Sequence, residues 1–221
     1  MAAGYGKNWD PAEHYKDGSV AGDYDRQRFA SVAGRAFNFL EKRLIRQAFA
    51  DLPRDSAIID VPCGTGRLAE VLLDSGFAVT GIDIAAPMLE VAQRRLQRFG
   101  DRFQHWVADA RQLAGSGIRA DAALCARVLM HFPLPEQIEF LRNVAAVTER
   151  RVVFTQSLDT RYHRVRRSAK RFLRHQNPAV YPVSPTDLRT LIEAAGLKEI
   201  RRSLLLPGIS EAVIVVTEPT R

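Results

Sequence analysis

Cysteine is scarce in this sequence, and long apolar runs are absent. Cys63 and Cys125 are the only cysteines and stand 62 residues apart, so the chain has neither a disulfide framework nor the close pairing of a zinc site. No apolar run approaches the roughly 20 residues that a membrane helix needs. The first ten residues lack the apolar centre of a secretory signal. We therefore expect a cytoplasmic protein without a bound metal.

Acidic residues are also few relative to basic ones, and the basic excess lies in one place. The 32 Lys and Arg residues outnumber the 25 Asp and Glu residues and leave a net charge of +7. Residues 161–175 contain seven Arg and Lys residues and no acid, so this segment equals the whole excess. Its apolar residues recur at helical spacing, at Tyr162, Val165, Ala169, Phe172 and Leu173. The pattern predicts a basic amphipathic helix.

The composition is otherwise that of a globular protein, with 46% hydrophobic and 26% charged residues. A chain of 221 residues buries roughly 70% of the surface that it exposes when unfolded, so it needs no disulfide to fold. We predict a single domain over 1–221, with an N-terminal arm at 1–30 and a lid-like basic insert at 161–183.

Strand and helix patterns alternate along the chain. A helix is predicted over 31–52, because its apolar residues form one stripe and Pro53 follows it. The predicted strands cover 57–61, 77–82, 103–107, 120–125, 152–155, 199–206 and 211–217, and the helices between them cover 67–74, 87–99, 134–147 and 184–196. This alternation indicates βαβ units and an α/β fold with a parallel sheet. Pro207 and Gly208 separate the last two strands, which are predicted to form an antiparallel hairpin.

The sharpest motif is the segment from Asp60 to Arg67, where the first predicted strand turns into a helix. Gly64 and Gly66 allow a tight turn and a close approach of the backbone to a ligand. The following helix presents unpaired N–H groups and the positive end of its dipole. Asp83 ends the next strand, where a carboxylate accepts hydrogen bonds from the two hydroxyls of a ribose. These features predict a nucleoside-binding unit; plain turn glycines and a helix cap at Asp83 are the simpler alternatives.

Two kinds of nucleoside cofactor fit this unit. Residues 64–69 match the G-x-G-x-x-G/A pattern of dinucleotide-binding proteins, which leaves a nicotinamide oxidoreductase as one alternative. Asp60 favours another ligand, because a carboxylate at the strand end suits a cationic amino group better than a pyrophosphate. Two further features favour that ligand, namely the stretch of about 50 residues before the unit and the strand pair at the end of the chain.

Taken in order, the motifs resemble those of class I S-adenosylmethionine-dependent methyltransferases of the small-molecule branch. Five segments carry the resemblance, namely 60–66, with Pro62 in place of the first glycine of the family motif, 83–84, 108–110, 126–132, and the helix and strands from 184 onward. The resemblance covers roughly 20–221. It implies a Rossmann-like, doubly wound sheet of seven strands in the order 3-2-1-4-5-7-6, with the last strand antiparallel.

The resemblance also implies which residues bind S-adenosylmethionine. They are Asp60, Pro62, Gly64 and Gly66 in the turn, Asp83 and Ile84 after the second strand, Asp109 and Ala110 at the adenine, and Arg127 near the methionine part. Asp109 is alternatively a plain turn residue. Cys63 is expected to fill space in a crowded turn rather than to act as a nucleophile.

For several further residues the sequence allows either a role in the site or a purely structural role. Met88 either packs on the adenine or belongs to a helix core. Tyr24, Arg26 and Arg28 either close over the methionine carboxylate, an anion that suits arginine, or belong to a solvated arm. His131 is either a base toward the acceptor or a structural residue.

Several kinds of acceptor fit the sequence. The resemblance implies methyl transfer to an O, N or C atom of a small-molecule or lipid-like acceptor. Residues 161–175 either dock on the domain as a plain helix or form a lid that favours an anionic acceptor, an anionic membrane surface or RNA. In the family that the sequence resembles, an Asn/Asp-Pro-Pro-Tyr/Phe segment after the fourth strand marks methylation of nucleobase amino groups. No such segment follows the fourth predicted strand here, so the resemblance implies that this activity is disfavoured and that DNA is not a partner. An RNA methyltransferase, an oxidoreductase and a binding protein without chemistry remain alternatives.

Overall fold

The computed structural model describes residues 29–159, 181–206 and 210–220. Nearly all of the predicted arm, with Tyr24, Arg26 and Arg28, lies outside the described residues. The same is true of most of the predicted basic insert, including all of 161–175. The predicted division of the chain into an arm, a domain and an insert therefore stays a prediction.

Seven strands and five α-helices make up the described part of the chain. The strands are β1 (Ala57–Asp60), β2 (Ala78–Asp83), β3 (Phe103–Val107), β4 (Ala120–Cys125), β5 (Thr148–Ser157), β6 (Leu197–Leu204) and β7 (Ala212–Pro219). The helices are α3 (Val32–Phe49), α4 (Ala69–Asp74), α5 (Ala86–Leu96), α6 (Leu134–Ala146) and α8 (Pro185–Ala194), with 3-10 turns η1 (Gln97–Arg102), η2 (Ala110–Gly115) and η3 (Leu129–His131). None of these helices has the length and apolarity that crossing a membrane requires.

All seven strands form one sheet in the order β3-β2-β1-β4-β5-β7-β6. The first five are parallel to one another, and β7 runs antiparallel to both β5 and β6. The predicted α/β fold, the strand order and the terminal antiparallel hairpin are therefore confirmed. β5 is longer than the predicted 152–155, because Thr148 and Arg151 pair with β4 at one end and Gln156 and Ser157 pair with β7 at the other.

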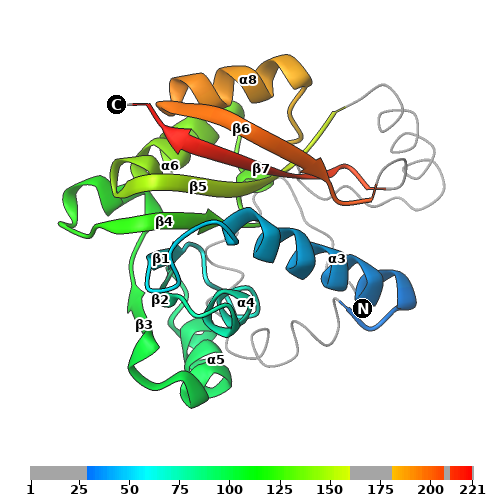
Figure 1. Ribbon diagram of the computed structural model, residues 1–221. Helices are drawn as coiled ribbons and strands as arrows, with labels where there is room; N and C mark the ends of the chain where they lie inside the picture. Colours follow the sequence, from blue (N-terminus) through cyan, green and yellow to red (C-terminus); the bar gives the residue numbers. More distant parts are fainter. Residues whose placement is uncertain (1–28, 160–180, 207–209, 221) are drawn as a thin grey trace.

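Helices cover both faces of the sheet, with α6 and α8 on one side and α3, α4 and α5 on the other (Figure 1). Neighbouring residues of β1 show why two cores form, since Ile58 packs in one apolar cluster and Ile59 in the other. The cluster around Ile59 includes Leu141 and Leu188, and the cluster around Ile58 includes Phe49. The central strands are thus buried on both faces, as a parallel sheet requires.

Short polar caps determine where two of the helices begin. The Ser31 side chain accepts a hydrogen bond from Gly34 N (3.0 Å) at the start of α3. At the start of α8, the Ser184 side chain accepts from Asp187 N (3.1 Å), and the Asp187 carboxylate accepts from Ser184 N (3.3 Å). The predicted helix at 184–196 therefore begins where the sequence places it, and Gly196, with φ of +72°, follows its end.

Gly66 brings the turn after β1 into close contact with α5. Its φ is +74°, and a Cβ at this position would lie 2.8 Å from Leu96 Cδ1 and 3.0 Å from Ala92 Cβ. Gly64 also has a positive φ, of +55°, but a Cβ there would meet nothing within 4 Å. Glycine is therefore required at the two positions for different reasons. At Gly64 the reason is the positive φ alone, and at Gly66 it is the positive φ together with the close packing against α5.

We predict that Gly66→Ala destabilises the protein more than Gly64→Ala. Both variants force an L-residue into the left-handed region, at about 1–2 kcal/mol. Gly66→Ala also overpacks the contact with α5, which adds about 1–3 kcal/mol. Urea denaturation of the two variants measures the difference, and equal free energies of unfolding would refute the packing argument.

Candidate active site

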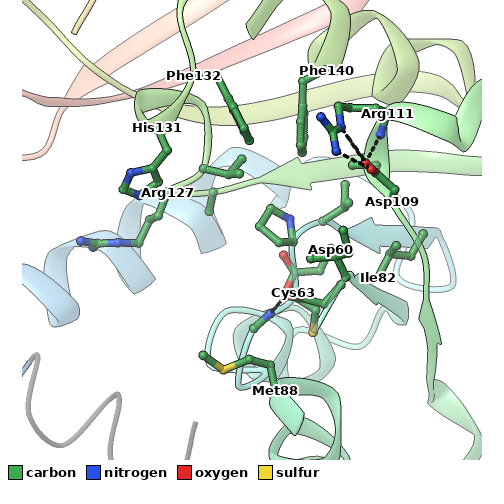
Figure 2. Close-up of a pocket in the computed structure, with 18 of the residues that line it drawn as sticks. Asp60, Cys63, Ile82, Met88, Asp109, Arg111, Arg127, His131, Phe132 and Phe140 are labelled. Carbon is green, nitrogen blue, oxygen red and sulfur yellow. Dashed lines mark hydrogen bonds and ion pairs between the residues drawn. The ribbon is translucent and has the colours of Figure 1, made fainter. Parts of the chain in front are cut away.

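A cavity of about 510 Å³ opens at the carboxyl ends of the parallel strands. Its walls come from the turn after β1 and from the segments that follow β2, β3 and β4. Figure 2 shows Asp60 and Cys63 in the middle of the cavity, Arg127 and His131 on one side, and Asp109 and Arg111 on another. In an open parallel sheet this edge is where ligands bind.

Asp83 holds the glycine turn against the end of β2. Its Oδ2 accepts a hydrogen bond from Gly64 N (2.8 Å), and its Oδ1 accepts one from Ala85 N (2.9 Å). Burial raises the pKa of the Asp83 carboxyl, and the hydrogen bonds from Ala85 and Gly64 act in the opposite direction. Each carboxylate oxygen can accept more than one hydrogen bond, so Asp83 retains acceptor capacity toward the cavity that it lines.

Cys63 fills the space between this turn and β2. A Cβ on Gly81 would lie 2.6 Å from Cys63 Sγ, so the thiol occupies the room that this glycine leaves. Burial and the nearby carboxylates of Asp60 and Asp83 raise the pKa of the Cys63 thiol well above its usual range. A protonated, buried thiol agrees with the predicted space-filling role and not with a nucleophile.

Asp60 is a buried carboxylate at the floor of the cavity. Its exposed fraction is 1%, and neither of its oxygens has a hydrogen-bond partner among the described residues. Burial raises the pKa of the Asp60 carboxyl well above its usual range, and the positive charge of Arg67 lowers it. A buried acceptor without a partner is costly to a folded protein, and it is an observation that points to a ligand with N–H donors or positive charge.

Asp109 stands at the opposite end of the cavity. Its carboxylate accepts hydrogen bonds from Arg111 Nη2 (2.7 Å) and Nε (3.1 Å), and from Arg111 N (2.9 Å) at the start of η2. The Arg111 guanidinium therefore holds the pKa of the Asp109 carboxyl below its usual range. Ile84, Met88 and Ala110 add apolar surface to the cavity wall. A flat apolar ring with a polar edge fits between such walls.

Two arginines of the cavity are held by a carboxylate from α3. Glu41, which is 1% exposed, accepts from Arg67 Nη2 at 2.6 Å and from Arg127 Nη1 at 3.2 Å. The Arg67 guanidinium lies over the Phe29 ring, with 4.8 Å to its centroid, and the Arg127 guanidinium lies over the Phe37 ring at 5.0 Å. Arg127 has a φ of +64°, and among the described residues it is the only one besides glycine with a positive φ.

Among the described residues, the structure brings the predicted site residues together with one exception. Asp60, Pro62, Gly64, Asp83, Ile84, Met88, Asp109, Ala110, Arg127 and His131 all line the cavity. Gly66 does not line it and instead packs behind the turn against α5. Met88 is both 3% exposed and part of the wall, so it serves the helix core and the cavity together. Tyr24 and Arg28 lie outside the described residues.

Three polar residues of the site escaped sequence analysis. Arg67 directly follows the glycine motif and Arg111 follows Asp109 by two positions, so proximity to a motif was a usable signal for both. Glu41 lies on α3, 26 residues from Arg67 and 86 from Arg127, and nothing local marks it. It resembles any other acidic residue of an amphipathic helix.

Comparison with known proteins gives a domain match and a shared fold. Residues 58–151 match the family described as a methyltransferase domain. Magnesium-protoporphyrin O-methyltransferase of Synechocystis sp. is 30% identical over 101 residues, 44% of this chain and 43% of that protein. Ubiquinone biosynthesis O-methyltransferase of Methylocella silvestris is 35% identical over 95 residues, 42% of this chain and 37% of that protein. The aligned part of the chain thus spans about two fifths of these relatives.

Solved structures share the fold over nearly the whole chain. The crystal structure of magnesium protoporphyrin IX methyltransferase from Synechocystis PCC 6803 with bound SAH has a TM-score of 0.77 at 19% identity, and the alignment covers 95% of this chain and 100% of that one. The 1,6-didemethyltoxoflavin-N1-methyltransferase of Burkholderia thailandensis has a TM-score of 0.68 at 17% identity, over 99% and 95% of the two chains. The domain match and the common fold confirm the predicted resemblance to class I S-adenosylmethionine-dependent methyltransferases.

Asp60→Asn should stabilise the protein without ligand at neutral pH. The folded carboxyl has a raised pKa, so its contribution to stability is greatest below the unfolded pKa, near 4, and falls as pH rises through the folded value. Replacement by a neutral amide removes that loss. The gain is on the order of 1 kcal/mol at pH 7 and shrinks toward pH 4.

Urea denaturation between pH 4 and pH 8 measures this dependence. Asp74→Asn, at an exposed carboxylate that pairs with Arg98, is the control and should change stability by less than about 0.5 kcal/mol. A wild-type protein more stable than Asp60→Asn at pH 7 would contradict the cost assigned to the buried carboxylate.

Glu41→Gln should destabilise the protein by about 3 kcal/mol, because it removes the buried carboxylate that the buried Arg67 and the half-buried Arg127 share. Glu70→Gln is the matched control, since Glu70 also pairs with two cations, Lys42 and Arg98, but at the surface. It should cost less than about 1 kcal/mol. Similar losses for the two variants, measured by urea denaturation, would refute the role of Glu41.

Proposed function

We propose that this chain, whose residues 58–151 match a methyltransferase domain, is an S-adenosylmethionine-dependent methyltransferase that acts on a small-molecule acceptor. One observation carries the proposal. Three carboxylates from the ends of β1, β2 and β3, those of Asp60, Asp83 and Asp109, line one cavity together with the glycine turn. That set supplies acceptors for the amino group, the ribose and the adenine of one ligand.

The adenosine part is assigned to the end of the cavity near β2 and β3. Asp83 is held by the backbone N–H groups of Gly64 and Ala85, so its carboxylate has one orientation in which to accept the ribose hydroxyls. Ile84 and Met88 would pack on the adenine ring, with Asp109 and Ala110 at its edge. Arg111 orients the Asp109 carboxylate for that contact.

The methionine part is assigned to the end near β1 and β4. The ligand carries an ammonium group, which would supply N–H donors to the Asp60 oxygens that have no hydrogen-bond partner among the described residues. It also carries a carboxylate, and Arg67 and Arg127 are the guanidiniums in this part of the wall. Glu41 holds both arginines in place from α3.

When bound, S-adenosylmethionine supplies a methyl group on a cationic sulfur, and the acceptor atom bonds to that carbon while the C–S bond breaks and its electron pair stays on sulfur. The chain contributes chiefly by positioning, because the two reacting atoms must lie in line. His131 lines the cavity after β4 and is proposed to take the proton when the acceptor is a hydroxyl. This role for His131 stays a prediction.

The finer predictions about partners concern the Arg-rich segment. Residues 161–175 predict an anionic or lipid-like acceptor, an anionic membrane surface or RNA, and this segment lies outside the described residues. These partners therefore stay predictions. Salt-dependent binding is the property that would single out RNA among them.

Thermal stability with added ligands tests the proposed function. S-adenosylmethionine and S-adenosylhomocysteine should each raise the melting temperature, because a ligand present at 100 times its Kd adds about 2.7 kcal/mol to the free energy of unfolding. NAD and NADP should not. A rise with NAD or NADP alone would overturn the proposal in favour of an oxidoreductase.

Asp83→Asn should weaken S-adenosylhomocysteine binding by about tenfold or more, because it removes charged hydrogen bonds to the ribose. Asp121→Asn is the matched control. Asp121 also accepts from a backbone N–H, that of Ala57 (2.9 Å), and pairs with Arg150, but it does not line the cavity. Isothermal titration compares the two variants, and unchanged affinity in a folded Asp83→Asn protein would refute the ribose assignment.

A further inference from the structure

Thr155, near the end of β5, holds the backbone of Arg127 by one hydrogen bond. Its Oγ1 accepts from Arg127 N at 2.7 Å. Thr155 is 4% exposed, and its side chain lies on the same face of the sheet as that of Val153, because alternate residues of a strand share a face. Val153 packs in the apolar cluster that includes residues of α3, whereas Phe154 packs in the cluster on the other face. The Thr155 hydroxyl therefore meets Arg127 on the α3 side of the sheet.

Thr155 does not line the cavity described above. It lines a second, mostly apolar cavity of about 520 Å³, which α3, β5 and β7 enclose together with the segments after β4 and β6. Arg127 lines both cavities. A ligand in the first cavity would therefore be affected by Thr155 through Arg127 rather than by direct contact.

The backbone of Arg127 has a conformation that is unfavourable for a residue with a side chain. Its φ of +64° lies in the left-handed region, where the Cβ of an L-residue crowds the following carbonyl oxygen. Such a conformation persists only where the surrounding contacts determine it, and it is common at binding and catalytic sites. The hydrogen bond to Thr155 fixes the peptide plane that precedes Arg127, and the positive φ then sets the direction in which the side chain leaves the backbone.

Contacts from α3 hold the far end of the Arg127 side chain. Its Nη1 donates to Glu41 Oε1 at 3.2 Å. Arg67 shares Glu41, but it has a further anchor on α3, since its Nη1 donates to Asn38 Oδ1 at 2.6 Å. Loss of the hydrogen bond to β5 would therefore displace the guanidinium of Arg127 and leave that of Arg67 in place.

We propose that Thr155 is a positioning residue for the methyl donor and acts through Arg127. Its hydroxyl keeps the Arg127 backbone in the left-handed region, and that backbone directs the guanidinium toward the carboxylate of the methionine part. The proposal rests on the proposed function, because the position of Arg127 matters for binding only if a ligand with such a carboxylate occupies the first cavity. A hydrogen bond outside that cavity thus helps to decide which ligands bind in it.

Two ligands that differ by one carboxylate test this role. S-adenosylhomocysteine carries the carboxylate, and S-adenosyl-3-thiopropylamine has the same adenosine, sulfur and amino group without it. Thr155→Val replaces the hydroxyl by a methyl group of similar size. It should weaken the binding of S-adenosylhomocysteine about tenfold, because the N–H of Arg127 loses its acceptor. The affinity for S-adenosyl-3-thiopropylamine, measured in the same way by isothermal titration, should not change.

Two further variants separate positioning from a general loss of packing. Thr155→Ser keeps the hydroxyl and should retain the wild-type affinity for both ligands. Thr217→Val is the matched control, because Thr217 is a fully buried threonine of β7 that lines neither cavity. Its hydroxyl also makes a short hydrogen bond to the backbone, to Val152 O at 2.8 Å. Thr217→Val should leave both affinities unchanged.

Arg127→Gly tests whether Thr155 acts through the arginine. Glycine adopts the left-handed conformation readily, so this variant removes the guanidinium without straining the backbone. It should weaken the binding of S-adenosylhomocysteine about tenfold or more, and the addition of Thr155→Val should cause no further loss. Losses that multiply in the double variant would overturn the proposal.

Equal weakening of the two ligands by Thr155→Val, or unchanged binding of both, would also overturn the proposal. The same holds if the wild type binds S-adenosylhomocysteine no more tightly than S-adenosyl-3-thiopropylamine, because Arg127 would then bind no carboxylate. Failure of the wild type to bind either ligand would instead refute the proposed function, so the two failures are distinguishable.

Discussion

The parallel pairing of β1 with β2 on one side and β4 on the other is the constraint on which the site depends. Ile58 to Asp60 is paired with both neighbours, so the chain reaches the carboxyl edge of the sheet at three adjacent strands. Residues that stand apart in the sequence are thereby placed around one cavity. The glycine turn fits this edge because Gly66 has no Cβ to collide with α5.

Three carboxylates at the site are buried, those of Glu41, Asp60 and Asp83, and they differ in how well their burial is compensated by hydrogen bonds and ion pairs. Asp83 and Glu41 are buried but satisfied, by backbone N–H groups in one case and by two guanidiniums in the other. Asp60 is buried with no such partner among the described residues. A carboxylate of this kind lowers stability and raises affinity for a ligand with N–H donors, which is a common compromise at binding sites.

Local patterns in the sequence encode much of the fold and part of the site. The strand order followed from the family resemblance, and the positions of Asp60, Asp83 and Asp109 followed from acids that end or follow apolar strands. Gly66 was predicted to bind the cofactor, but a side chain is excluded there by the close packing of the turn against Leu96. Leu96 belongs to α5, and no local sequence pattern reveals that α5 packs against this turn. The early start of β5 was missed because Glu149 to Arg151 look like a charged turn.

The sequence by itself determined the order of strands and helices, the glycine turn and the acids at the strand ends, because each of these depends on residues close together in the chain. Only the tertiary structure decided that Glu41 holds Arg67 and Arg127, and that α3, β5 and β7 enclose a second apolar cavity. The contact between Glu41 and Arg127 joins residues 86 positions apart. Such contacts arise from how the helices pack on the completed sheet. No local propensity encodes such a contact, since its energy depends on the burial that the whole fold creates.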